Sequence, residues 1–152
     1  MHTLKAFVIP TAAFLVILGI FYHAEGRFPD KEENTGHEVL QSDQLGKRVY
    51  TRNCLTCHQK DGSGVSSMYP PVIDNPRVKG DKAGLIKIIL EGQRGPIEVH
   101  GEHYNGVMPP FRSLSDKEVA SVLTYMRQNF KNDTTAVSVE KVKEVRDSLK
   151  SN

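Results

Sequence analysis

The apolar positions of the chain form one continuous run near the N-terminus and several shorter helical stripes further on. Ala6–Ala24 is apolar except for Thr11 and His23, and a helix of that length just crosses a hydrocarbon core of about 30 Å. Lys5 precedes the run and an acidic stretch follows it, which favours a cytoplasmic N-terminus. We therefore predict that residues 1–24 are a single transmembrane helix, acting as an anchor or uncleaved signal, with the remainder outside the plasma membrane or in the periplasm.

A cleaved signal peptide is the alternative for this run. Ala24-Glu25-Gly26 is a small-x-small triplet that a peptidase could cut. The apolar run is longer than the usual signal core of about 7–15 residues, which favours a retained anchor. Both alternatives export the protein.

The next segment, residues 25–41, is polar and charged and predicts a tether with little to bury. Ser42 is a plausible N-cap, and a helix starting there places Leu45, Val49 and Tyr50 on one face. We expect the folded domain to span residues 42–130.

Three further helices are predicted from their caps and periodicity. One starts after Asp81 and ends at Gly92, a second starts with the capping box of Ser115 and Glu118, and a third covers about 138–149. Their predicted buried stripes are Leu85, Ile86, Ile88 and Ile89; Val119, Val122, Leu123 and Met126 with Tyr125 at the edge; and Val139, Val142, Val145 and Leu149.

Proline- and glycine-rich segments separate these helices. Residues 66–80 predict extended coil and residues 93–112 predict loop. The sequence therefore predicts an all-α fold, with residues 131–152 as a C-terminal helix extension.

The charge of the chain argues against a nucleic-acid partner. The formal net charge is only +2, although residues 45–130 carry 12 Lys and Arg against 8 Asp and Glu. Hydrophobic residues make up 38% of the chain, some of them in the N-terminal run, so the remaining core is modest.

The strongest chemical signal is Cys54-Leu55-Thr56-Cys57-His58. Two cysteines three apart with histidine directly after the second form the attachment signature of c-type haem. The two thiols can reach the two porphyrin vinyl groups, and the imidazole of His58 can ligate iron as the proximal ligand. One covalent haem with its iron would also supply apolar volume to the core, so we expect the apo-protein to be poorly folded.

Three other interpretations of these cysteines remain. A C-x-x-C redox motif would be flanked by a βαβ pattern, which is not evident here. A zinc site could combine Cys54 and Cys57 with His100 and His103, but the spacing between the pairs matches no common zinc finger. A free pair of structural thiols leaves His58 unexplained.

The sixth iron ligand is best sought in the segment around Met108. Gly106 permits a close backbone approach, and Pro109-Pro110 stiffen the loop that carries the thioether. His100 or His103 would instead give a bis-histidine haem of lower potential.

The other methionines are weaker candidates for the ligand. Met126 fits a buried helical stripe, and Met68 lies on the loop expected around the proximal face.

From about residue 43 to 130 the chain resembles a class I c-type cytochrome. The resemblance rests on a helix leading into C-x-x-C-H, a proline loop, a middle helix, a Met-Pro loop and a C-terminal helix. It implies the class I cytochrome c fold around one haem, with His58 and Met108 as ligands. It also implies that Pro70, or alternatively Pro71, accepts the proximal imidazole N–H.

The resemblance further implies a helix crossing in which Gly46 and Tyr50 meet Val122 and Tyr125. The segments Tyr104–Phe111 and Val139–Arg146 are similar to cytochrome domains fused to, or encoded beside, copper nitrite reductases, quinoprotein dehydrogenases and haem-copper oxidases.

The expected function is one-electron transfer, without catalysis by the chain itself, between respiratory-type donor and acceptor proteins such as an oxidase, reductase or dehydrogenase. A set of basic side chains could steer an acidic partner, and Arg77 or Arg94 could pair with a haem propionate. The set is Lys60, Arg77, Lys79, Lys82, Lys87, Arg94 and Arg112. A gas sensor would need a labile sixth ligand, and a peroxidase would need an acid–base pair that the sequence does not show.

Overall fold

The computed structural model describes residues 34–132 and 134–151, which belong to one compact unit. The predicted anchor at residues 1–24 and the tether up to Glu33 lie outside the described residues. No helix in the described ranges is long and apolar enough to cross a membrane.

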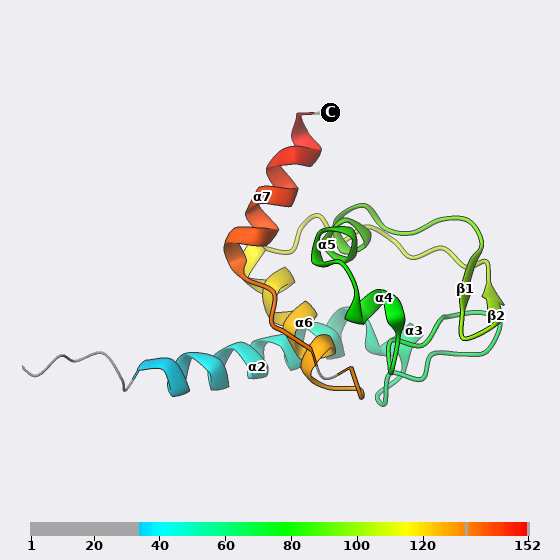
Figure 1. The fold of residues 1–152 in the computed structure, drawn as a ribbon, viewed down its shortest axis with the longest axis horizontal. Helices are drawn as coiled ribbons and strands as arrows, with labels where there is room; N and C mark the ends of the chain where they lie inside the picture. The colour runs from blue at the N-terminus through cyan, green and yellow to red at the C-terminus, as the bar shows by residue number, and fades with distance from the viewer. Residues whose placement is uncertain (1–33, 133, 152) are drawn as a thin grey trace, which may run out of the picture. The chain divides into compact units, whose positions relative to one another are not determined.

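The unit is mostly helical, as predicted, with one small hairpin (Figure 1). In chain order its elements are α2 (Asn34–Asn53), α3 (Leu55–His58), α4 (Pro76–Lys79), α5 (Lys82–Glu91), β1 (Ile97–Val99), β2 (Glu102–Tyr104), α6 (Asp116–Gln128) and α7 (Val139–Lys150).

The first helix begins earlier than predicted. Helix α2 starts at Asn34, so Ser42 lies inside it rather than at its N-cap, and residues 34–41 are helical rather than tether. The stretch has no proline and only one glycine, so its polarity does not prevent helix formation. The prediction equated a polar segment with irregular structure, and that inference was wrong.

Two short elements interrupt the segments predicted to be irregular. Helix α4 lies within the predicted coil of residues 66–80, with Asn75 as N-cap and Pro76 in its first turn. Asn75 Oδ1 accepts the Arg77 N–H at 2.8 Å. This Asn-Pro pair is a helix-start signal that the sequence contained.

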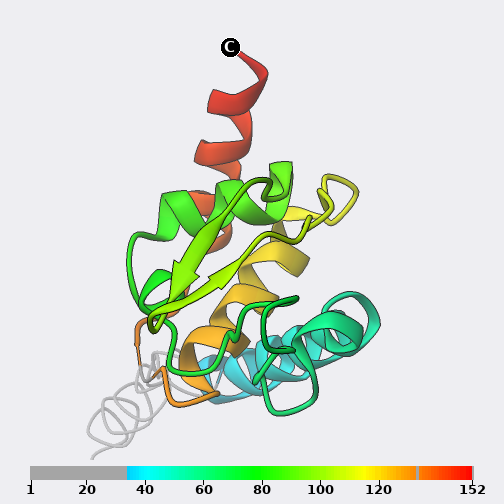
Figure 2. The same ribbon diagram turned by 90° about the vertical axis from the view of Figure 1, so that its right-hand side faces the viewer.

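The second is the hairpin of β1 and β2, which lies within residues 93–112 and makes the loop prediction wrong for residues 97–104, while the fold as a whole is mostly helical. Its strands pair from Ile97 with Tyr104 to Val99 with Glu102. His100 and Gly101 form the turn, and both have positive φ, at 53° and 79°, as a tight hairpin turn requires. The hairpin faces the viewer in Figure 2, with α5 and α6 behind it.

Helices α2 and α6 form the most extensive helix contact of the unit. A Cβ at Gly46 would lie 2.3 Å from the Ser121 carbonyl oxygen and 2.7 Å from Tyr125 Cβ, so only glycine permits this approach. The ring of Tyr50 lies 5.8 Å from that of Tyr125 and 5.1 Å from that of Phe130. Gly46 thus meets Ser121 and Tyr125 at the expected crossing, while Val122 is buried in the same core.

The remaining helices begin and end close to where their caps predict. The Asp81 carboxylate accepts N–H bonds at the start of α5, and Ser115 with Glu118 forms the expected capping box of α6. Three predicted stripe positions differ. Ile88 and Leu149 are only half-buried while Leu90 is buried, and Val139 is 40% exposed, so it does not belong to the buried side of α7.

Two buried polar side chains fasten the loops around these helices. Asn132 accepts the Asn75 N–H and donates to the carbonyls of Val72 and Met126.

Arg127 is 2% exposed and is satisfied entirely by neutral oxygens. It donates to the carbonyls of Val78, Gly80 and Thr135 and to the Thr134 hydroxyl. No sequence pattern had singled out Arg127 or Asn132.

Candidate cofactor site

A largely apolar cavity in the described unit gathers every site residue predicted from the sequence. It lies between α3, α5, the hairpin and the segment that follows the hairpin. The predicted site residues that line it are Cys54, Cys57, His58, Pro70 and Met108. The sequence motif and the Met-Pro loop, although about fifty residues apart, therefore face one space.

The single turn of α3 places both cysteines beside His58. Cys54 is buried and Cys57 half-buried, and both are free thiols. The His58 N–H donates to the Cys54 carbonyl at 2.9 Å, which closes the turn. Burial, and secondarily the neighbouring Cys57, raises the pKa of Cys54 to about 11, so the thiol is protonated at neutral pH.

The ring of His58 is oriented by the loop that follows it. Its Nδ1 lies 2.9 Å from the Pro70 carbonyl oxygen, and a carbonyl can only accept, so Nδ1 carries the proton and Nε2 keeps its lone pair. Burial lowers the pKa of His58, and the bond to Pro70 partly opposes that shift. The Pro71 carbonyl instead accepts from Asn75 Nδ2 at 2.5 Å, which separates the two candidate prolines.

Gly64 brings the Pro70 segment close to His58. Its φ is +67°, and a Cβ there would lie 2.2 Å from the Tyr69 carbonyl oxygen. The Gly64 N–H also donates to the His58 carbonyl at 3.1 Å. The positive φ and the close approach together explain the glycine.

Backbone hydrogen bonds to Gln93, on the other side of the hairpin in sequence, hold Met108 in place. Its N–H and carbonyl both pair with those of Gln93 at 3.0 Å, and a Cβ at Gly92 would lie 2.4 Å from the Met108 carbonyl oxygen. Gly106 likewise lies against the Met68 carbonyl, where a Cβ would come within 2.7 Å. The close approach inferred from Gly106 is thus made to the Met68 loop.

The alternative ligands lie elsewhere or in different surroundings. His100 Nε2 is 2.9 Å from the Asp74 carbonyl oxygen at the hairpin turn, and neither it nor His103 lines the cavity. Within the described ranges, no group of three or more His, Cys, Asp and Glu side chains could hold a metal ion. The zinc interpretation therefore has no structural support there.

Two more methionines line the same cavity. Met126 is 4% exposed, as expected for a core residue, whereas Met68 is 53% exposed at the rim. The loop that carries Met68 contacts the Met108 segment, residues 104–111, at Gly106. This contact was not predicted from the sequence.

Glu102 ties the hairpin to the Met68 loop and was missed from the sequence. Its carboxylate accepts from the hydroxyl of Ser66, from the Ser67 N–H at 2.7 Å and from the Tyr104 hydroxyl at 2.8 Å. These bonds, that from Ser66 first, lower the pKa of Glu102. The carboxylate thus fixes one edge of the cavity.

The residues present fit a covalently attached haem. Two free thiols on one helical turn adjoin His58. The Nδ1–H of His58 is bonded to the Pro70 carbonyl, so the lone pair of Nε2 is available to bind iron. A thioether stands in the same apolar cavity. Soft sulfur and imidazole donors are the axial ligands that haem iron takes.

Comparison with known families decides the assignment. The profile of the cytochrome c family matches residues 44–130, more than half of the chain. The chain belongs to the cytochrome c family. Its cofactor is accordingly haem c, covalently bound with its iron, and the cytochrome domain transfers electrons.

Named relatives support a class I c-type cytochrome. Cytochrome c-552 of Thermus thermophilus is 38% identical over 95 residues, which cover 60% of this chain and 62% of the relative. The cytochrome c subunit of quinone alcohol dehydrogenase from Gluconobacter oxydans is 35% identical over 66% of this chain and 22% of its own length. The chain thus spans less than two thirds of these relatives.

The nitric oxide reductase of Stutzerimonas stutzeri has a subunit that matches over a larger share of both chains. It is 29% identical over 124 residues, 80% of each chain. Several relatives of this cytochrome are therefore cytochrome subunits of dehydrogenases, and one is a subunit of a reductase.

Proposed function

We propose that this cytochrome is a one-electron carrier in which His58 and Met108 are the two axial ligands. The supporting observation is that both residues line one cavity with Cys54 and Cys57, while His58 Nδ1 is bonded to the Pro70 carbonyl. Filling both axial positions with protein side chains leaves no open site for a substrate, which suits electron transfer rather than catalysis.

Haem c, when bound, supplies a couple between Fe(II) and Fe(III). The chain contributes attachment through the thiols of Cys54 and Cys57 and an imidazole fixed in one orientation by Pro70. The apolar cavity walls exclude water, and the thioether of Met108 favours a higher potential than a second imidazole would.

We further propose that the partners are a donor and an acceptor protein of a respiratory type at the outer face of the membrane. The names of the relatives, a quinone alcohol dehydrogenase subunit and a nitric oxide reductase subunit among them, support a dehydrogenase or reductase as partner. The apolar run Ala6–Ala24 supports attachment to that membrane.

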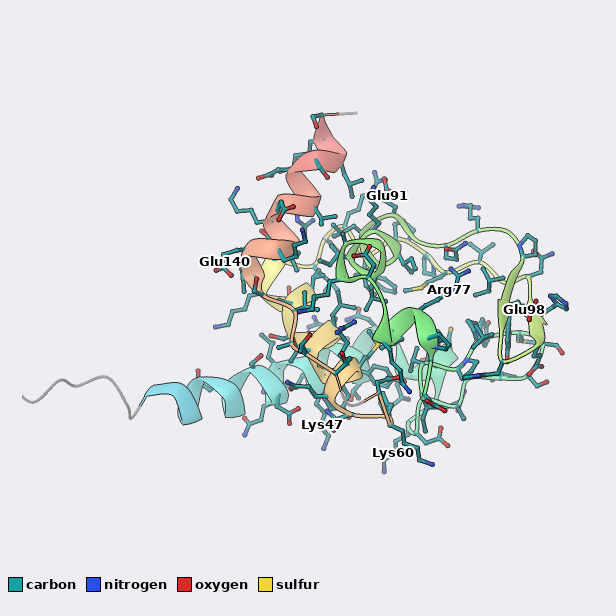
Figure 3. The ribbon with its side chains drawn as sticks, viewed as in Figure 1. Lys47, Lys60, Arg77, Glu91, Glu98 and Glu140 are labelled. Carbon is teal, nitrogen blue, oxygen red and sulfur yellow. The ribbon has the colours of Figure 1, made fainter. Side chains whose placement is uncertain are left out.

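The basic side chains considered for docking are unevenly placed. Lys79 pairs with Asp74, and Arg112 lies 3.9 Å from Glu91. Arg77 lines the cavity and is exposed to solvent, while Lys60 extends from the loop after α3 (Figure 3). Arg77 is therefore the basic side chain best placed for a haem propionate.

The ligand is tested by Met108→Ala, with Met126→Leu and Met68→Leu as matched controls, because all three methionines line the cavity. The ferric protein should show a long-wavelength methionine–iron charge-transfer band that only Met108→Ala abolishes. A band that survives in Met108→Ala, or disappears in a control, would assign the ligand elsewhere. Intact mass of membrane-extracted protein gives the haem count and shows whether residues 1–26 are retained.

A further inference from the structure

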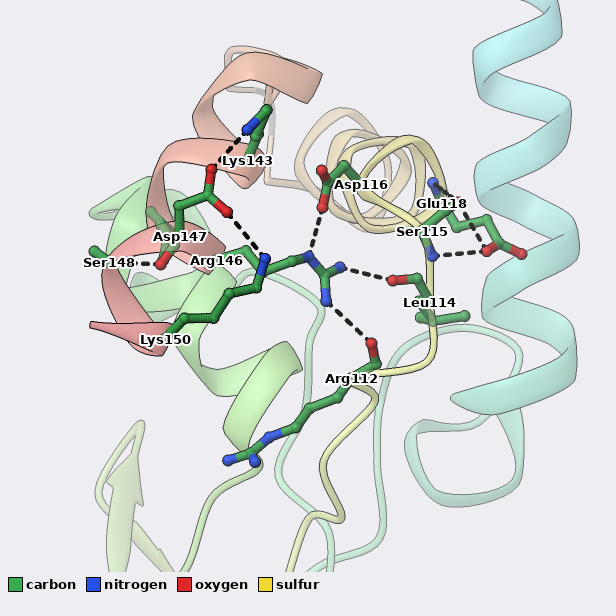
Figure 4. A network of polar contacts seen from close by, with 11 residues as sticks. Arg112, Leu114, Ser115, Asp116, Glu118, Lys143, Arg146, Asp147, Ser148 and Lys150 are labelled. Atoms are coloured by element: carbon green, nitrogen blue, oxygen red, sulfur yellow. Dashed lines mark hydrogen bonds and ion pairs between the residues drawn. The ribbon is translucent and has the colours of Figure 1, made fainter. Parts of the chain in front are cut away.

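The C-terminal helix α7 reaches back to the end of the Met108 segment through one side chain. The guanidinium of Arg146 binds three oxygens (Figure 4). Nε donates to Asp116 Oδ1 at 2.6 Å, one terminal nitrogen to the Arg112 carbonyl at 3.0 Å, and the other to the Leu114 carbonyl at 2.7 Å. Arg112 and Leu114 belong to the turn that joins the Met108 segment to α6, and Asp116 is the first residue of α6.

That turn is coupled to Met108 by a short and stiff piece of chain. Pro109 and Pro110 have fixed φ angles, and the Phe111 N–H then donates to the Ile89 carbonyl at 2.8 Å. The Leu114 N–H donates to the Phe111 carbonyl at 3.1 Å. The turn at residues 112–114 is therefore one of the restraints on the short, stiff segment that carries Met108.

Met108 is thus held from both directions along the chain. Upstream it pairs with Gln93 through two backbone hydrogen bonds, and downstream the turn is held by Arg146. The Arg146 side chain is 20% exposed and that of Asp116 27%, whereas those of Lys143 and Asp147 on the outer side of α7 are 68% and 48% exposed. A three-pronged, partly buried guanidinium site holds its partners more firmly than an exposed ion pair.

We propose that Arg146 is a positioning residue for the sixth ligand: it fixes the turn after the Met108 segment and so keeps the Met108 thioether at the iron. This rests on the proposed His58/Met108 ligation. Residue 146 lies outside the matched segment 44–130, so the device belongs to the part of the chain beyond the family profile.

The test compares Arg146→Ala, Arg146→Lys and the control Lys143→Ala in the haem-loaded protein. Lys143→Ala removes the Lys143–Asp147 pair of the same helix and leaves the three hydrogen bonds of Arg146 in place. The measurements are the affinity of the ferric protein for added imidazole, which must displace the methionine, the charge-transfer band during heating, and global unfolding by far-UV circular dichroism.

Arg146→Ala should bind imidazole about tenfold more tightly, since losing charge-assisted hydrogen bonds eases local opening by roughly that factor. Its charge-transfer band should disappear well before the helices melt. Arg146→Lys should show a smaller increase in imidazole affinity than Arg146→Ala. It should not reach the wild-type value, because an ammonium cannot reproduce the fork of three donors. Lys143→Ala should match the wild type.

Unchanged imidazole affinity in Arg146→Ala, with band and helices melting together, would overturn the proposal and leave Arg146 a purely structural residue. If Arg146→Ala does not fold, Asp116→Asn takes its place and should raise imidazole affinity by a smaller factor; no increase there counts equally against the proposal. A wild-type protein that binds haem but lacks the band would refute Met108 ligation itself. That failure is recognisable before any Arg146 variant is measured.

Discussion

The crossing of α2 and α6 offers the sharpest test of the packing, through Gly46→Ala. The new methyl group would lie 2.3 Å from the Ser121 carbonyl oxygen and 2.7 Å from Tyr125 Cβ. Both distances are shorter than any real contact, and one neighbour is backbone, so the helices must separate. Overpacking of this kind costs about 3 kcal/mol at the upper end of its usual range.

The helix propensity of alanine offsets only part of this cost, because it exceeds that of glycine by about 1 kcal/mol. Gly46→Ala should therefore lower the free energy of unfolding by about 2 kcal/mol, which is a fall in melting temperature of about 10 °C for a domain of this size. Thermal unfolding of the ferric holoprotein, followed by far-UV circular dichroism, measures it.

Gly84→Ala is the matched control for this experiment. Gly84 also lies within a helix, but a Cβ added there would have the flexible Asp81 carboxylate as its nearest neighbour, at 3.2 Å. The same substitution at this position should be neutral or stabilise by up to about 1 kcal/mol. A Gly46→Ala protein as stable as the wild type would refute the crossing geometry.

Three other predictions concern the loops and the cofactor. Asn132→Ala leaves the Asn75 N–H and the carbonyls of Val72 and Met126 without their amide partner, and it should cost about 3 kcal/mol in denaturant unfolding. The folded-state pKa of Glu102 lies below its ordinary value of 4.5, so its stabilisation is present above that pH and is lost as pH falls through the lowered pKa. Glu102→Gln should therefore flatten the acid side of the stability–pH profile, whereas Glu98→Gln on the same hairpin should not; a drop unchanged in Glu102→Gln would contradict the assignment. Cys54→Ala/Cys57→Ala should lack covalent haem by intact mass and lose much of its helical circular dichroism, because the emptied apolar cavity no longer supports the core; native-like helicity would show that the fold does not need the cofactor.

Local signals predicted much of this fold because they are self-contained. The capping box of Ser115 and Glu118 and the cap at Asp81 each specify a helix start within four residues. The Cys54–His58 motif likewise carries its chemistry in five consecutive positions. Such features can be identified from a few consecutive residues, whatever the rest of the chain contains.

The features that the sequence analysis missed depend on distant partners or on weaker signals. Helix α2 begins at Asn34, and its first residues carry no apolar stripe from which a helix could have been predicted. The hairpin consists of two strands of three residues, too short for an alternating pattern to stand out. Arg146 and Asn132 act on carbonyl groups about thirty to sixty residues away, which no local pattern reveals.

The buried guanidinium of Arg127 shows that the limits of the family profile are not those of a stable fragment. Two of its four oxygen partners, Thr134 and Thr135, follow residue 130. Ending the chain at residue 130 would remove two hydrogen-bond partners of a buried cation. It would also expose the core surface that Val142 and Val145 now cover. The C-terminal residues beyond the family profile therefore contribute to the stability of the cytochrome domain itself.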